Sequence, residues 1–171
     1  MVHGSIVGET VGEAGGEVVS CAALVERLTA LRAEGKTVVL ANGCFDILHV
    51  GHARYLQGAA READILVVAI NDDESVRALK GPDRPVMDAA SRAELVAALR
   101  PVHFVVTFPE LSPSLLIQEI RPDVHCKGPD YTPETVPERD VVRAYGGRTV
   151  IVGGPKDHST RDIVAKLRAS S

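Results

Sequence analysis

Two histidines three positions apart, His49 and His52, lie in a glycine-containing segment that follows a short apolar run. Residues three apart share one side of a helix, so both imidazoles would project from its first turn. Gly51 keeps the surface between them low, and Gly43 lets the backbone turn tightly and approach a ligand. Together with the positive end of the helix dipole, two such imidazoles favour the binding of a phosphate group.

Each histidine also has a simpler interpretation, because a single histidine at a helix start is most often a cap or a surface residue. Zinc is a further alternative, but two histidines at this spacing without a third ligand nearby are weak evidence for a metal. We therefore assign no metal-binding residue. Cys44 is expected to contribute its backbone N–H, and Asp46 to brace the loop.

The segments around these residues alternate between apolar strands and helices. Strands are expected at 37–41, 65–70, 103–107, 124–126 and 149–152, and helices at about 20–35, 51–61, 89–99, 113–120, 138–145 and 160–168. This alternation predicts an α/β fold, a Rossmann-like three-layer domain with a mostly parallel five-stranded sheet. Ligands of such sheets bind beyond the carboxyl ends of the strands. Polar residues gather after the expected strands, at 42–52, 71–73, 127–131 and 156–160.

Length and composition narrow the classes of protein. The 171 residues suit one domain, which we place at 21–171 after a flexible leader at 1–20. The net charge of −4 argues against a nucleic-acid or membrane surface, and no apolar run approaches the roughly 18 residues of a membrane span. Three widely spaced cysteines form neither a disulfide framework nor a zinc pattern, which favours a reducing, cytoplasmic location.

The segment GCFDILHVGH (43–52) resembles the G-x-F-D-x-x-H-x-G-H signature of the cytidylyltransferase-like nucleotidyltransferases. Further segments are similar to the heptose 1-phosphate adenylyltransferases of that family: VAINDDESVRALKGPDRPV, CKGPDY, AYGG and DHSTRDI. The resemblance runs from about Thr37 to Leu167. One departure is His158-Ser159-Thr160-Arg161, where relatives commonly have a Ser-Ser-Thr-Thr-like run.

The resemblance implies a role for each matched residue. His49, His52 and Lys80 would be catalytic, with Lys80 in a flexible segment (79–82) reaching over the phosphates. Arg92 would clamp the phosphate of the acceptor through bidentate hydrogen bonds. The remaining matched residues would bind the nucleotide: Gly43, Cys44, Phe45, Gly51, Lys127, Asp130, Ser159 and Thr160.

The implied reaction transfers AMP from ATP to D-glycero-β-D-manno-heptose 1-phosphate, with Mg²⁺ bridging phosphate oxygens. The product, ADP-heptose, would supply cell-surface glycans such as the lipopolysaccharide core. The family implies a homodimer, and the chain length implies a stand-alone form served by a separate sugar kinase. A CTP-dependent cytidylyltransferase acting on glycerol 3-phosphate or another small phosphate stays open, as does a non-catalytic nucleotide-binding module. A dinucleotide oxidoreductase is disfavoured, because no G-x-G-x-x-G follows the first expected strand.

Overall fold

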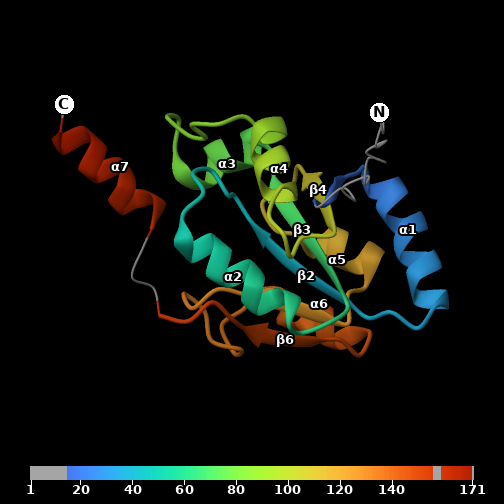
Figure 1. The fold of residues 1–171 in the computed structure, drawn as a ribbon. Helices are drawn as coiled ribbons and strands as arrows, with labels where there is room; N and C mark the ends of the chain where they lie inside the picture. Colours follow the sequence, from blue (N-terminus) through green and yellow to red (C-terminus); the bar gives the residue numbers. More distant parts are fainter. Residues whose placement is uncertain (1–14, 156–158, 171) are drawn as a thin grey trace, which may run out of the picture.

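The computed structural model describes residues 15–155 and 159–170 and contains one parallel sheet flanked by helices (Figure 1). Its strand order is β1-β4-β3-β2-β5-β6, and every neighbouring pair is parallel. The strands are β1 Glu17–Val18, β2 Val38–Gly43, β3 Ile65–Asn71, β4 Phe104–Phe108, β5 Val124–Lys127 and β6 Arg148–Ile151. The helices are α1 Cys21–Ala33, α2 Val50–Ala60, α3 Asp73–Lys80, α4 Ala89–Ala97, α5 Ser114–Ile120, α6 Arg139–Ala144 and α7 Thr160–Ala169.

The predicted α/β class and parallel sheet are confirmed, but the described sheet has six strands rather than five. The additional strand is β1, in which Glu17 and Val18 pair with Phe104 and Val105. The predicted leader over 1–20 therefore extends too far, because its last residues belong to the sheet. Residues 1–14 lie outside the described part of the chain.

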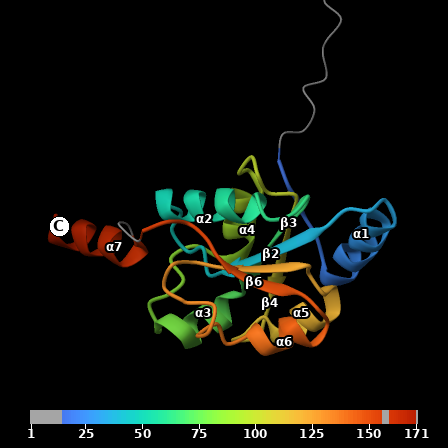
Figure 2. The same cartoon turned by 90° about the horizontal axis from the view of Figure 1, so that it is seen from below.

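Helices cover both faces of the sheet (Figure 2), which gives the predicted three layers. One apolar core joins α2 and α4 to alternate residues of the strands, such as Val39, Ala41 and Val68. The other joins α1, α5 and α6 to the intervening residues, such as Leu40 and Val67. β2 and β3 are apolar on both sides because both of their faces are covered.

The order of connections reverses between β2 and β5, and we call the region beyond the carboxyl ends of these two strands the crevice. The chain runs from β2 through β3 to β4, and then returns to form β5 and β6 on the other side of β2. α2, which follows β2, packs on one face, whereas α6, which follows β5, belongs to the core of the other face. Such a reversal of strand order is where open α/β sheets bind ligands, at the carboxyl ends of the strands.

The last helix, α7, extends away from the sheet (Figures 1 and 2). None of its described residues is fully buried. Its beginning is nevertheless tied to the loop after β2, because the Thr160 hydroxyl donates a hydrogen bond to the Ile47 carbonyl at 3.3 Å. This contact brings residues 113 positions apart to the same end of the sheet.

Candidate active site

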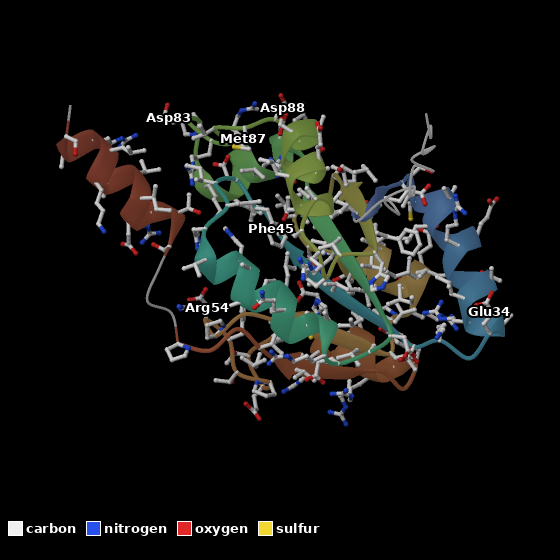
Figure 3. All side chains as sticks on the ribbon, viewed as in Figure 1. Glu34, Phe45, Arg54, Asp83, Met87 and Asp88 are labelled. Carbon is white, nitrogen blue, oxygen red and sulfur yellow. The ribbon has the colours of Figure 1, made fainter. Side chains whose placement is uncertain are left out.

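The loop between β2 and α2 turns around the ring of Phe45, which lies next to α2 and is labelled in Figure 3. Phe45 adopts a positive φ of 49° and is 2% exposed. Its ring packs against those of His52 and Tyr55, with centroids 5.1 and 6.4 Å away. A Cβ at Gly43 would come within 3.2 Å of the Phe45 ring. A side chain at 43 would therefore press on this ring, which favours glycine for a reason that the sequence did not indicate.

His49 and His52 stand together at the start of α2, with ring centroids 4.0 Å apart. His49 is the N-cap, which confirms the simpler interpretation of this residue: its Nδ1 accepts a hydrogen bond from the Gly51 N–H at 3.1 Å. The His49 N–H donates in turn to Nδ1 of His52 at 3.3 Å. Two backbone N–H groups at this end are thus engaged by the imidazoles.

The surroundings of His52 set its protonation state. Burial, followed by the neighbouring charges of His49 and Lys80, lowers the pKa of His52 to about 4. The ring is therefore neutral near pH 7, and because its Nδ1 accepts a hydrogen bond, its proton is on Nε2. A neutral imidazole with an Nε2–H can donate to a phosphate oxygen but is too weak a base to remove a proton efficiently at neutral pH.

Lys80 is the last residue of α3, not part of a flexible segment as predicted, and Asp72 caps this helix through the Ser75 N–H. The Lys80 side chain is exposed. Its charge lowers the pKa of both His52 and Cys44, which places the ammonium close to the loop after β2. Lys80 thus lies near this loop, at the end of a helix.

Asp46 braces the loop, as predicted. One of its carboxylate oxygens accepts hydrogen bonds from the N–H groups of Val86 and Met87, at 2.8 and 3.1 Å. The other lies 3.1 Å from Nε of Arg84. The carboxylate, 2% exposed, therefore fastens the segment between α3 and α4 to the loop after β2.

Arg92 does not face a phosphate, which corrects the prediction of an acceptor clamp. It is 0% exposed, and its guanidinium donates to the carbonyls of Met87, Cys44 and Asn71 at 3.0, 2.6 and 2.8 Å. It also donates to the carboxylate of Asp73 at 2.7 Å. Four of its hydrogen bonds are thus satisfied within the protein, and they join the loop after β2, the end of β3, α3 and α4.

The side chain of Cys44 is a thiol rather than a thiolate near pH 7. Burial is the main cause that raises its pKa, against the lowering effects of Lys80, Arg92 and Arg84. Its Sγ lies 3.9 Å from Oδ1 of Asn71, and its carbonyl is held by Arg92. The thiol therefore has no enhanced nucleophilicity at neutral pH.

The β5 side of the crevice carries a buried ion pair. Lys127, at the end of β5, is 8% exposed, and its Nζ lies 3.5 Å from Oε2 of Glu138. The same Nζ lies 5.1 Å above the ring of Tyr131. Burial lowers the pKa of Lys127, whereas Glu138 and Cys44 raise it. Asp130 lies in the exposed turn that follows β5.

Ser159 and Thr160 form the start of α7, as the sequence predicted. Ser159 is the N-cap: its Oγ accepts from the Asp162 N–H and donates to the Asp162 carboxylate at 2.7 Å. Both hydroxyls are thus engaged within the protein, with Thr160 bound to Ile47. His158, the first residue of the departure from the family pattern, lies outside the described residues.

A buried polar cluster beneath the site was missed from the sequence. Nε2 of His125 lies 2.9 Å from Oδ1 of Asn42, and the hydroxyl of Tyr55 donates to the carbonyl of Cys126 at 2.8 Å. The Asn42 N–H donates to the same hydroxyl at 3.3 Å. These bonds fix the end of β2 just before the motif. Asn42 and His125 are polar residues in neighbouring apolar strands, and this placement could have predicted that they lie together. The sequence carried no comparable signal for Glu138.

In 15–155 and 159–170, no group of three or more His, Cys, Asp or Glu side chains is placed to hold a metal ion. None of the helices in this part of the chain is both long and apolar enough to cross a membrane.

This chain is similar to several known proteins. A family model described as cytidylyltransferase-like matches residues 40–166. Among curated relatives, the bifunctional protein HldE of Syntrophotalea carbinolica is 49% identical over 80% of this chain and 28% of its own length. The HldE protein of Geotalea uraniireducens is 46% identical, over 96% of this chain and 35% of its own length. This chain thus spans about a third of the length of these curated relatives or less.

A solved structure is also similar. The lipopolysaccharide core biosynthesis protein from Thermoplasma volcanium superposes with a TM-score of 0.60 and 28% sequence identity. The superposition covers 69% of this chain and 97% of that protein. Its match supports both the Rossmann-like fold and the relationship found from the sequences.

Proposed function

Because this chain belongs to the cytidylyltransferase-like family and is a nucleotidyltransferase, we propose that it transfers AMP from ATP to D-glycero-β-D-manno-heptose 1-phosphate. The products are ADP-heptose and pyrophosphate. The observation that carries the proposal is the pair of imidazoles at the start of α2, with Lys80 close by. The choice of a heptose is supported by the similarity to the HldE proteins and to a lipopolysaccharide core biosynthesis protein.

The reaction needs no general base. The attacking group is a phosphate oxygen, which already carries negative charge at neutral pH, and the leaving group is pyrophosphate. Catalysis therefore consists of aligning two polyanions and stabilising the charge that develops on the phosphorus oxygens. A site with neutral donors and an exposed cation, and without an acid–base pair, suits this requirement.

In this mechanism His52 donates its Nε2–H to a phosphate oxygen, and His49 orients His52 through its backbone N–H. Lys80 neutralises charge on the triphosphate from the end of α3. The backbone at Gly43, Cys44 and Phe45 lines the base of the crevice. Ser159 and Thr160 would approach the phosphates from the start of α7, and Asp130 would lie on the nucleotide side.

Mg²⁺ enters the proposal with ATP, as the ion that bridges phosphate oxygens. The described residues provide no cluster of carboxylates for it, and Asp46 is already engaged by two N–H groups and Arg84. The donor set thus fits an ion carried by the nucleotide rather than by the protein, and we assign to Mg²⁺ no protein ligand and no separate step.

The setting of the reaction follows from its chemistry. We expect a separate sugar kinase to supply the sugar phosphate acceptor, and we expect the reaction to take place in the cytoplasm. The pathway would be the supply of activated heptose to the lipopolysaccharide core. A homodimer is the expected assembly, and light scattering of the purified protein measures it directly.

Pyrophosphate release tests the reaction, with Mg²⁺ present and with ATP and CTP each combined with heptose 1-phosphate and with glycerol 3-phosphate. We expect release only with ATP and heptose 1-phosphate. Release with CTP and glycerol 3-phosphate would replace the substrates but keep the mechanism. No release with any pair, despite measurable ATP binding, would favour another acceptor and then a non-catalytic module.

A further inference from the structure

The ion pair of Lys127 and Glu138 has a chemical character different from that of the phosphate-binding groups. Glu138 is 3% exposed; its Oε1 accepts a hydrogen bond from the Ser112 hydroxyl at 3.2 Å. Its Oε2 lies 3.5 Å from Lys127 Nζ and has no hydrogen-bond partner among the described residues. A buried carboxylate oxygen left in this state is costly, so a donor from a ligand would stabilise it.

The pair lies at the crevice that the reversal of strand order creates. Cys126 pairs with Ala41 of β2, so Lys127, one residue further, lies beside the end of β2 where the histidine loop begins. The electrostatic effect of Cys44 on Lys127 agrees with this position. The ring of Tyr131, which is 37% exposed, lies 5.1 Å from Lys127 Nζ. The pair therefore lies on the β5 side of the point where the strand order reverses, near the loop that carries the histidines.

The charge of the pair decides what it can bind. The carboxylate of Glu138 compensates the ammonium of Lys127, so the pair is close to neutral and attracts a phosphate far less than the exposed Lys80 does. It still offers one acceptor oxygen and several N–H donors within a short distance. This combination, beside an aromatic ring, suits an uncharged ligand group that both donates and accepts, such as adjacent hydroxyl groups on a sugar.

We propose that the Lys127–Glu138 pair is a subsite for sugar hydroxyl groups, in which Glu138 accepts from one hydroxyl and Lys127 donates to its neighbour. The proposal rests on the proposed function, which supplies two sugars, the ribose of the nucleotide and the acceptor. Both have the chemistry that the pair recognises, and the experiment distinguishes them.

The experiment compares the wild type with Glu138→Gln, which keeps the shape but loses the charged acceptor. Calorimetry measures the binding of ATP and of heptose 1-phosphate separately, and steady-state assays give KM and kcat for each. We expect one of the two ligands to bind about tenfold to a hundredfold more weakly, the effect of losing one hydrogen bond to a charged group. Weaker binding of ATP identifies ribose, and weaker binding of the sugar phosphate identifies the acceptor.

Glu134→Gln is the matched control, because Glu134 lies exposed in the same segment. It should bind both ligands like the wild type and unfold at a similar temperature. Glu138→Gln leaves the buried Lys127 without its charged partner and should unfold at a lower temperature, so the binding of all three proteins is compared well below that temperature. A second measurement uses the wild type alone, so it does not depend on whether a variant folds. If the pair binds hydroxyls, 2′-deoxy-ATP, 3′-deoxy-ATP or a deoxy analogue of the acceptor must bind more weakly than its parent.

The failures of the two proposals are distinct. Folded Glu138→Gln with unchanged binding of both ligands would overturn the subsite, even if the wild type makes ADP-heptose. Absence of turnover with every acceptor would overturn the proposed function, and the subsite would then be judged on ATP against its deoxy analogues. The subsite would be refuted if ATP and its deoxy analogues bound equally well, and if the wild type and Glu138→Gln bound each tested sugar phosphate equally well.

Discussion

At the scale of single residues, the site depends on which groups are charged near pH 7. Lys80 is exposed and cationic, His52 is neutral, and Lys127 is compensated by Glu138. Three residues that the sequence presents as similar polar candidates thus take three different electrostatic roles. Burial and neighbouring charges set these roles, and both come from the fold.

Replacing His52 by Ala should lower kcat by about 10²- to 10³-fold, the usual effect of removing one donor to the developing charge. His52→Gln, whose amide can still donate, should retain more activity than the Ala variant. Pyrophosphate release measures both, and circular dichroism reports the fold. Near-normal kcat in a folded His52→Ala protein would remove this residue from the mechanism.

Arg92→Lys should destabilise the protein rather than weaken the binding of the acceptor. The buried guanidinium donates to four segments, and a lysine can replace only part of this pattern. Disrupting a buried charge network typically costs about 3–5 kcal/mol, so urea unfolding should show a clear loss of stability. A variant with normal stability but a raised KM for the sugar phosphate would instead support the acceptor clamp that the sequence predicted.

At the scale of elements, strand β5 makes stability depend on pH. His125 is 0% exposed, and burial, with a smaller effect from Lys127, lowers its pKa to about 3. In the unfolded chain its pKa is about 6.5, so below that pH the unfolded state binds a proton that the native state does not. Stability is thus fully present above pH 6.5 and falls as the pH is lowered towards 3.

The loss due to His125 approaches about 1.4 kcal/mol per pH unit within this range. Urea unfolding at several pH values should show it, and His125→Gln should reduce the slope while His52 keeps its own contribution. Equal slopes for the variant and the wild type would mean that His125 accepts a proton in the native state.

The elements also show what could be predicted from the sequence. β2 to β6 were predicted to within about two residues, because each has a short apolar run, and those of β2 and β3 are buried on both faces. α3 was missed, since Asp73–Lys80 is mostly polar and is defined by its cap at Asp72 rather than by an apolar stripe. β1 was missed because two residues carry no periodicity.

In the site, the motif predicted which residues gather after β2, because their spacing alone places them at one helix start. It could not predict that Arg92 is buried, because the sequence pattern of an arginine at a helix start is the same whether the side chain faces solvent or the loop carbonyls. The partner of Lys127 could not be predicted either, because Glu138 is brought to it by the turn between β5 and α6.

At the scale of the whole molecule, the two faces of the sheet contribute different chemistry to one crevice. The face covered by α2 and α4 provides the histidines and the braced loop, whereas the other face provides Lys127 and Glu138. The parallel arrangement brings the carboxyl ends of β2 and β5 together, so groups 75 or more positions apart can contact one ligand.

The edge of the sheet opposite β6 is separate from this crevice, so its removal should affect stability but not catalysis. β1 lies beyond β4 and β3, and residues 16–19 donate three backbone hydrogen bonds to Ala97, His103 and Val105. At about 0.5–1.5 kcal/mol each, their loss should destabilise a chain that begins at Ser20 by roughly 1.5–4.5 kcal/mol. Ser20 itself is kept because it caps α1.

A chain that begins at Gly15 retains all of these bonds and is the matched control. It should unfold in urea like the full-length protein, and all three proteins should have the same kcat under conditions in which they are folded. Equal stability of the two shortened chains would mean that β1 contributes nothing to the fold. A lower kcat in the chain that begins at Ser20, measured well below its unfolding temperature, would show that the edge of the sheet is coupled to the crevice three strands away.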